Sequence, residues 1–188
     1  MTAGVARRTL ALLGLRCSGK STVGKALART LARPFVDLDD EVLRLSRYAG
    51  WSAPSVGALL ERAGAARFRD LEAAALRRWL EPCARVVLAT GGGIVEREDN
   101  RVWLARSAFS VFLSVPVAVL RKRLVADPTP RPALLGQDAV SEVEELEARR
   151  EPLYRDVADL VLECGDAPAE EIAARIASAL SSASPTTH

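Results

Sequence analysis

Gly14-Leu15-Arg16-Cys17-Ser18-Gly19-Lys20-Ser21-Thr22 is the stretch that decides the fold of this 188-residue chain. An apolar run, Thr9 to Leu13, precedes it, and a helix-like stretch, Thr22 to Ala32, follows it. The spacing G-x-x-x-x-G-K-[ST] places backbone N–H groups of the loop and of the next helix around phosphate oxygens. Gly-Lys-Ser also joins strands to helices for purely structural reasons, but the strand, loop and helix order favours a nucleoside triphosphate site. There Lys20 reaches the β- and γ-phosphates, and Ser21 supplies a hydroxyl to Mg²⁺.

Length and composition fit one compact domain with room for a mobile insert. With 49% hydrophobic and 27% charged residues, the chain can bury a sizeable core, whereas two full domains would be cramped. The net charge of +2 comes from 26 basic and 24 acidic residues, and no basic stretch is interleaved with aromatics, so nucleic acid is not an expected partner. No apolar run is long enough to span a membrane, and a cytoplasmic location is the default expectation.

The cysteines and the histidine suggest neither a zinc site nor a disulfide framework. Cys17, Cys83 and Cys164 are odd in number, far apart and without C-x-x-C spacing. His188, the one histidine, ends a tail that contains Ser, Thr and Pro, so catalysis by imidazole is not expected. Proton transfer is therefore expected to use carboxylates.

Five short apolar runs alternate with helical patterns along the chain. This alternation predicts an α/β fold, a three-layer α/β/α sandwich with a five-stranded parallel sheet. The runs are nearly continuous in apolar residues, as are strands that helices cover on both faces. The expected strands are Thr9 to Leu15, Pro34 to Leu38, Arg85 to Ala89, Phe109 to Ser114 and Leu160 to Leu162.

The segments that follow the strands are the candidate site, because ligands of such sheets gather at the carboxyl ends of the strands. These segments are the phosphate loop, Asp37-Leu38-Asp39-Asp40 and Thr90-Gly91-Gly92-Gly93. All three are expected to open onto the same edge of the sheet.

Two regions interrupt the alternation and are candidates for mobile parts of a kinase domain. Helices from Ala53 to Leu80 belong to a candidate substrate-binding insert at about 40–80. A Pro-rich stretch at about 126–139 is a candidate lid before the helix Val140 to Val157. We expect a single domain over residues 1–181 and a disordered tail over residues 182–188.

Asp37 and Asp39 are the candidate groups for metal binding and proton transfer. Two positions apart in an extended segment, their side chains leave the same face. Beside a Mg²⁺-nucleotide, one carboxylate can hold metal-bound water while the other accepts the proton of an incoming hydroxyl. The alternative is helix capping, since Asp39 or Asp40 would serve as the N-cap of a helix that begins near Glu41.

The run Gly91-Gly92-Gly93 costs backbone entropy and so requires a reason beyond composition. Close approach of the backbone to a ligand is one reason, and a wide turn is the alternative.

Three arginines are candidate anion-binding residues. Arg69 and Glu72 are i and i+3 on a helix-like stretch, close enough for Glu72 to orient the guanidinium toward a carboxylate ligand. A solvated surface pair is the alternative for them. Arg150 is equally ambiguous by itself, and Arg131 is either a lid arginine that neutralises charge on a transferred phosphoryl group or a solubilising loop residue.

Taken together in this order, the motifs resemble those of the shikimate kinase family, which is similar to the nucleoside monophosphate kinases and shares their phosphate loop. The resemblance runs from about Thr9 to Val157. It depends on G-L-R-C-S-G-K-S-T-V-G, F-V-D-L-D-D, A-R-F-R-D-L-E, A-T-G-G-G-I-V, R-P-A-L-L and R-R-E-P-L-Y-R-D-V-A.

The resemblance implies an ATP- and Mg²⁺-dependent enzyme in which Asp39, Lys20 and Arg131 are catalytic. Lys20 would hold the ATP phosphates, Ser21 and Asp37 would organise Mg²⁺, and Arg131 would close over the phosphates with the lid. The remaining nucleotide-binding residues would be Gly14, Arg16, Cys17, Ser18, Gly19, Ser21 and Thr22 of the loop, with Arg123 packed on the adenine.

The same resemblance implies shikimate as the small-molecule substrate and a monomer as the functional state. Asp39 would contact the substrate hydroxyls and act as base toward the 3-hydroxyl that is phosphorylated. Arg69 and Arg150 would clamp the carboxylate, and Gly91, Gly92 and Gly93 would line the same pocket through their backbone.

The sequence departs from the family pattern at two places. Cys17 stands where the family has glycine, so a bulkier loop is expected, with a thiol that is either reactive at the helix N-terminus or inert and packed under the loop. The lid motif, Arg131-Pro132-Ala133-Leu134-Leu135, has one extra residue, and altered lid closure is expected.

Two other functions are compatible with parts of the pattern. A gluconate-type kinase would keep the chemistry but change the acceptor, and the arginine pair with the triple glycine favours shikimate over it. A non-catalytic sensor would carry a DNA-binding segment upstream. No such DNA-binding segment is expected here, because the first expected strand starts by about residue 9 and leaves no room for one.

Overall fold

The computed structural model describes residues 8–80, 84–126 and 142–182. Its centre is a five-stranded parallel sheet with the strand order β2-β3-β1-β4-β5. The strands are β1 (Thr9–Leu13), β2 (Phe35–Asp37), β3 (Val87–Ala89), β4 (Ala108–Ser114) and β5 (Leu160–Glu163). All five expected strands are therefore present, with bounds that differ by a few residues at most.

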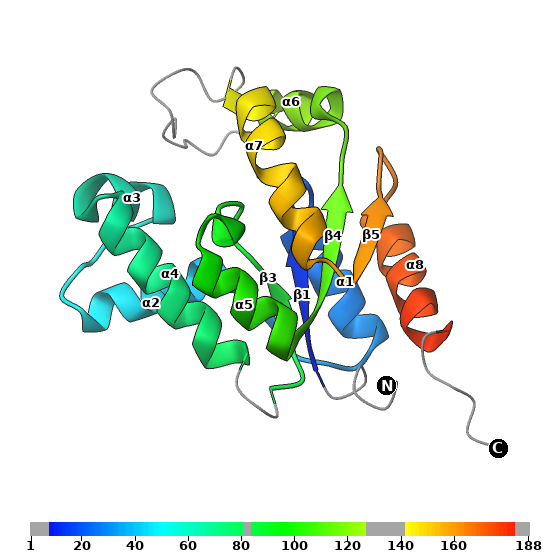
Figure 1. Ribbon diagram of the computed structural model, residues 1–188, viewed down its shortest axis with the longest axis horizontal. Coiled ribbons are helices and arrows are strands. Elements are labelled where there is room, and N and C mark those ends of the chain that lie inside the picture. Colours follow the sequence, from blue (N-terminus) through cyan, green and yellow to red (C-terminus); the bar gives the residue numbers. More distant parts are fainter. Residues whose placement is uncertain (1–7, 81–83, 127–141, 183–188) are drawn as a thin grey trace.

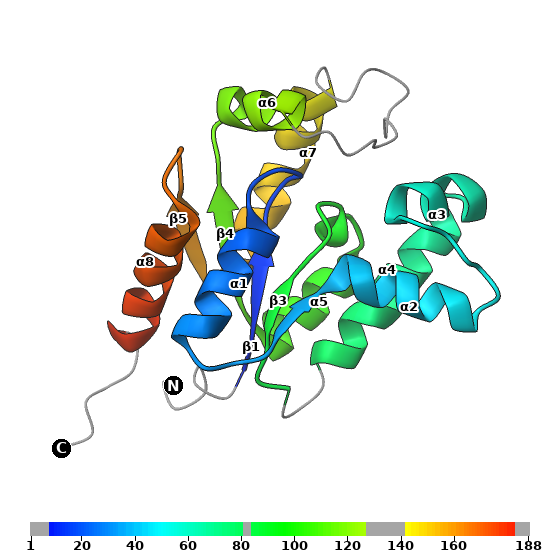
Figure 2. The same ribbon diagram turned by 180° about the vertical axis from the view of Figure 1, so that it is seen from behind.

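Helices cover both faces of this sheet, so the predicted three-layer α/β/α sandwich is confirmed. Helices α5 and α7 lie in front of the sheet in Figure 1, and α1 and α8 cover the opposite face, which is in front in Figure 2. The helices are α1 (Lys20–Thr30), α2 (Leu38–Tyr48), α3 (Val56–Ala63), α4 (Ala65–Leu80), α5 (Glu98–Ser107), α6 (Val117–Ala126), α7 (Glu142–Val157) and α8 (Ala169–Ser182). A 3₁₀ turn, η2 (Ile94–Glu96), precedes α5.

The central strands explain why their sequence is so uniformly apolar. Every residue of β1 and β3 is buried, because neighbouring strands pair with their edges while helices cover their faces. Fully burying one leucine side chain, such as Leu12, contributes roughly 1.5–3 kcal/mol to folding. The sheet is thus a rigid base for the loops at its carboxyl edge.

Strand register brings three loops into line at that edge. Ala89 at the end of β3 pairs with Leu12 of β1 on one side and with Asp37 of β2 on the other. The phosphate loop, the start of α2 and the segment that begins at Thr90 consequently leave the sheet from adjacent positions, as expected from the sequence.

The insert between β2 and β3 differs in detail from the expected one. Helices α2, α3 and α4 lie on the side of the molecule away from β5 (Figures 1 and 2). The helices expected from Ala53 to Leu80 are α3 and α4; the first begins at Val56 rather than at Ala53, and the two are separated at Gly64, where φ is +79°. A positive φ is readily adopted only by glycine, so α3 ends there and α4 starts in a new direction.

Two expectations fall partly or wholly outside the described residues. The lid at about 126–139, with Arg131, lies in the gap between α6 and α7 except for its first residue. Helix α8 continues to Ser182, and the rest of the expected tail is not described. Within the described part of the chain, no helix is long and apolar enough to cross a membrane.

Candidate active site

The phosphate loop connects β1 to α1 in a compact turn around Lys20. Gly19 is the N-cap of α1 with φ +93°, a left-handed conformation that explains the glycine. The Lys20 ammonium donates to the carbonyl oxygens of Gly14 at 2.9 Å and Leu15 at 2.6 Å, and to Ser18 Oγ at 3.3 Å. These contacts hold the cation at the start of α1, where the helix dipole also favours anions.

Cys17 has a positive φ of +61°. For a residue with a side chain this left-handed conformation costs about 1 kcal/mol, which is the physical reason that glycine suits this position. The side chain is half-buried and packs against the hydrophobic core. The loop thus holds Cys17 at the cost of a left-handed backbone conformation, and its side chain packs against the core.

A cavity of about 540 Å³ lies beside the loop and contains most of the predicted site residues. Gly14 and Ser18 of the loop are not on its wall, and each of them accepts a hydrogen bond from Lys20. The predicted residues on the wall are Arg16, Cys17, Gly19, Lys20, Ser21, Thr22, Asp37, Asp39, Arg69, Gly91, Gly92, Gly93 and Arg150. Residues from five separate segments therefore share one cavity.

Ser21 and Asp37, the two predicted metal ligands, lie in direct contact. The Ser21 hydroxyl donates to Asp37 Oδ2 at 2.6 Å, so a hydroxyl oxygen and a carboxylate oxygen lie together at the first turn of α1. Hard oxygen donors of this kind fit Mg²⁺, which keeps several waters and takes few protein ligands. The residues present therefore suit the expected cation.

The expectation of an extended segment at Asp37 and Asp39 is wrong. Helix α2 starts at Leu38 rather than near Glu41, and Asp37 is its N-cap, with Oδ1 accepting from the Asp39 backbone N–H at 3.1 Å. Asp39 and Asp40 lie in the first helical turn, so neither is the cap. The first turn of α2 nevertheless leaves Asp39 on the cavity wall together with Asp37.

Arg69 is held in place by a buried carboxylate, and the alternative of a solvated surface pair is wrong. Its Nη1 donates to Glu72 Oε2 at 2.7 Å, and the Glu72 side chain is only 2% exposed. Burial raises the pKa of Glu72, and the Arg69 charge opposes that rise. The interaction predicted from the i, i+3 spacing is thus present, and it orients a guanidinium toward the cavity.

Close contacts explain the glycine run, which also forms a turn into η2. A Cβ on Gly93 would lie 2.1 Å from Arg69 Nη2, and one on Gly91 would lie 2.5 Å from Glu72 Oε1. Protein side chains therefore occupy the space that a larger residue would need. The prediction that a ligand also approaches this backbone stays a prediction.

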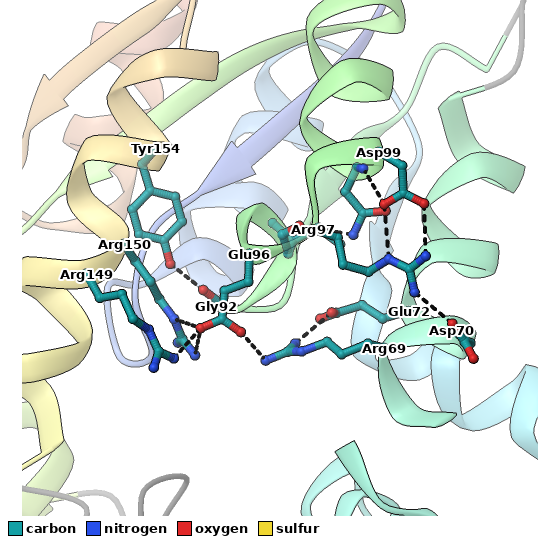
Figure 3. Close-up of polar contacts among 12 residues, drawn as sticks. Arg69, Asp70, Glu72, Gly92, Glu96, Arg97, Asp99, Arg149, Arg150 and Tyr154 are labelled. Atoms are coloured by element: carbon teal, nitrogen blue, oxygen red, sulfur yellow. Dashed lines mark hydrogen bonds and ion pairs between the residues drawn. The ribbon is translucent and has the colours of Figure 1, made fainter. Parts of the chain in front are cut away.

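Glu96 is a central residue of the site that sequence reasoning missed. In Figure 3 its carboxylate lies between Arg69 on one side and Arg149 and Arg150 on the other. Oε2 accepts from Arg69 Nη2 at 2.9 Å, while Oε1 accepts from Arg150 Nε at 3.0 Å and from Arg149. Burial raises the pKa of Glu96, but the charges of Arg150 and Arg69 outweigh burial and hold it below its usual value.

Arg150 reaches the cavity from α7 and is almost fully buried, with a side chain 4% exposed. One turn later on the same face, Tyr154 donates its hydroxyl to the Gly92 carbonyl and stacks on Phe112, with ring centroids 4.9 Å apart. Burial raises the pKa of Tyr154, so the phenol stays a donor. The i, i+4 spacing of these residues on α7 is the signal that could have identified Tyr154.

Arg123, the predicted adenine contact, lies at the far side of the phosphate loop. Its guanidinium donates to the Cys17 carbonyl at 3.4 Å and to the Gly165 carbonyl at 3.2 Å. It is therefore next to the nucleotide loop, although it is not part of the cavity wall. Arg131 lies outside the described residues, and its role stays a prediction.

The parallel sheet, the phosphate loop and the polar cavity beside it define a P-loop phosphotransferase. A profile of the shikimate kinase family matches residues 16–181. The chain is 43% identical to the shikimate kinase of Nitratidesulfovibrio vulgaris over 84% of its own length and 86% of that protein's. It is also 40% identical to shikimate kinase 2 of Escherichia fergusonii, over 87% of each chain. The chain belongs to the shikimate kinase family.

Solved structures agree with this assignment. The shikimate kinase of Acinetobacter baumannii in complex with shikimate matches with a TM-score of 0.83 and 32% identity, over 96% of both chains. A gluconokinase from Sinorhizobium meliloti has a TM-score of 0.61 at 17% identity, over 94% of this chain and 93% of that one, which shows a shared fold alone.

Proposed function

We propose that this chain transfers the γ-phosphoryl group of ATP to the 3-hydroxyl of shikimate, a step of aromatic amino acid biosynthesis. The observation that carries the proposal is the cavity whose wall includes both the phosphate loop and the Arg69 and Arg150 guanidinium groups. One cavity with a phosphate site and a carboxylate site suits a kinase whose acceptor is a hydroxy acid. The family and the complex of the A. baumannii relative with shikimate support the choice of acceptor.

In the proposed reaction, each end of the cavity binds one substrate. Lys20 exchanges the loop carbonyls for the β- and γ-phosphate oxygens, and Arg123 would pack on the adenine. Arg69 and Arg150 bind the acceptor's carboxylate, and the Gly91–Gly93 backbone borders the ring. This arrangement holds the hydroxyl in reach of the γ-phosphate, which is most of what phosphoryl transfer requires of a protein.

Asp39 is the proposed base, and Ser21 with Asp37 would hold Mg²⁺. An Asp39 carboxylate beside Gly91 can accept the proton of the attacking hydroxyl. When bound, Mg²⁺ neutralises charge on the phosphate oxygens. Arg131 would add a further positive charge from the lid.

A coupled assay of ADP release with shikimate, with gluconate and without an acceptor tests the proposal. Turnover is expected with shikimate only. Turnover with gluconate but not shikimate would show a different acceptor, and binding of shikimate without turnover would show a sensor.

We also infer that the enzyme acts as a monomer in the cytoplasm, with neither nucleic acid nor membrane as a partner. The family resemblance and the small-molecule cavity support this inference. Light scattering during size-exclusion chromatography measures the first part directly.

A further inference from the structure

The arginines that would bind the acceptor's carboxylate already bind a carboxylate of the protein itself. Each oxygen of Glu96 accepts from a different one of the two, Arg69 at 2.9 Å and Arg150 at 3.0 Å (Figure 3). A carboxylate clamped between two guanidinium groups is the arrangement that the acceptor needs. Glu96 therefore occupies N–H donors of the same two guanidinium groups that would bind the acceptor.

Contacts other than those to Glu96 also help to position the two arginines. Arg69 is oriented by the buried Glu72 carboxylate at 2.7 Å and packs directly over the Gly93 backbone. Arg150 is nearly buried on α7, and its Nη1 is 3.6 Å from where a Cβ on Gly92 would be. Glu96 is therefore a second carboxylate at Arg69, whereas at the buried Arg150 it is the hydrogen-bond partner of the guanidinium.

Hydrogen bonds hold the turn that carries Glu96, whereas the Glu96 side chain is partly exposed. Asn100 Nδ2 donates to the Ile94 carbonyl at 3.0 Å, and Arg101 Nη1 donates to the Val95 carbonyl at 2.7 Å, which ties the η2 turn to α5. The Glu96 side chain is 24% exposed and also contacts Arg149, whose side chain is 48% exposed. A rotation of Glu96 toward Arg149 and solvent would therefore leave the backbone of the turn in place.

We propose that Glu96 is a specificity-determining residue that competes with the acceptor's carboxylate for Arg69 and Arg150, and so weakens acceptor binding. The inference rests on the proposed function, because it takes the acceptor to be a hydroxy acid bound by these arginines. If Glu96 stays in place, two carboxylates share the same guanidinium groups and repel each other. If it turns away, binding must first break its hydrogen bonds to both arginines. Either path costs binding free energy.

Glu96→Gln removes the negative charge with little change of shape, so it should tighten shikimate binding. A Gln amide has one acceptor oxygen, and its NH₂ group cannot accept from a guanidinium. We expect the dissociation constant and the KM for shikimate to fall about tenfold, equivalent to about 1.4 kcal/mol. Calorimetric titration with shikimate in the absence of nucleotide measures the first, and the coupled assay measures the second.

Three comparisons make the test specific. Glu98→Gln removes an exposed carboxylate two residues away, at the start of α5, and should change neither constant by more than about twofold. Glu96→Asp keeps the charge and should stay closer to the wild type than Glu96→Gln. The methyl ester of shikimate carries no charge, so the gain from Glu96→Gln should disappear with that ligand.

The result that overturns the proposal is an unchanged or increased dissociation constant in Glu96→Gln, in a protein whose circular dichroism spectrum matches the wild type. An increase would make Glu96 a support for the arginines, and no change would make it neutral. A gain that persists with the methyl ester would also overturn it. These outcomes are distinct from failure of the proposed function, which is shown by a wild-type protein that binds shikimate without turning it over.

Discussion

Gly93→Ala places a methyl group where the Arg69 guanidinium lies. We expect it to weaken acceptor binding while it changes the stability of the fold little. The new Cβ would lie 2.1 Å from Nη2, 2.4 Å from Nη1 and 2.5 Å from Cζ of Arg69. Gly93 has φ −98° and ψ 6°, a conformation open to alanine, so the backbone itself is not strained. The three nearest atoms all belong to the guanidinium end of one flexible side chain.

The size of the displacement predicts the size of the effect. To restore ordinary contact at about 3.5 Å, Nη2 must retreat by about 1.4 Å. Such a shift is large enough to break the hydrogen bonds at 2.7 Å to Glu72 and 2.9 Å to Glu96, and it moves the guanidinium from the position proposed for acceptor binding. Losing one charge-assisted interaction costs about 1.5–3 kcal/mol, so we expect kcat/KM for shikimate to fall roughly 10- to 100-fold.

Steady-state kinetics with varied shikimate and urea unfolding are the paired assays. The free energy of unfolding should fall by less than about 2 kcal/mol, since only a partly exposed side chain has to move. In an Arg69→Ala background the clash is absent, so Gly93→Ala should then change kcat/KM by less than about twofold. Wild-type kinetics in the single variant, or an equal loss in both backgrounds, would refute the reasoning.

Three further predictions concern single side chains of the site. Asp39→Asn should lower kcat by roughly 10²-fold or more with ATP binding largely intact, as a lost base requires, and wild-type turnover in the coupled assay would reject that role. Cys17→Gly relieves a left-handed conformation but adds backbone entropy to the unfolded chain, so the two effects nearly cancel. The free energy of unfolding should change by less than about 1 kcal/mol in a urea titration, and a loss above about 2 kcal/mol would show that the thiol is needed for packing. The pKa of Glu96 is held low in the folded state, so its contribution to stability is complete above its ordinary pKa of about 4.3 and is lost as the pH falls through the folded-state pKa. Glu96→Gln should therefore lose less stability than the wild type between about pH 5 and pH 3, and parallel curves would contradict the assignment.

The features that local sequence predicts well are those governed by neighbouring residues. The phosphate loop between β1 and α1, the position of each strand and the Arg69–Glu72 pair all follow from spacing along the chain. The start of α2 was misplaced by a few residues, because Asp37, Asp39 and Asp40 are all residues that can cap a helix. Only the backbone conformation at Asp37 distinguishes them.

The role of the glycine run required the tertiary structure. Sequence reasoning left a turn and a ligand contact open as explanations. The folded chain adds Arg69 and Glu72, which arrive from α4 and occupy the space above Gly93 and Gly91. A side chain from another element leaves no trace in the composition of the loop that it packs against.

What the sequence by itself determined is the class of fold, the nucleotide loop and the set of residues at the strand ends, since each depends on local pattern and on the rule that parallel strands share one ligand edge. Only the tertiary structure decided how the charges pair. Glu96 meets Arg69 from 27 residues away and Arg150 from 54 residues away, through the packing of α4, η2 and α7. Charge pairing over such separations depends on how helices pack in space, and that packing is why the proposed acceptor site contains a carboxylate that its sequence motif does not reveal.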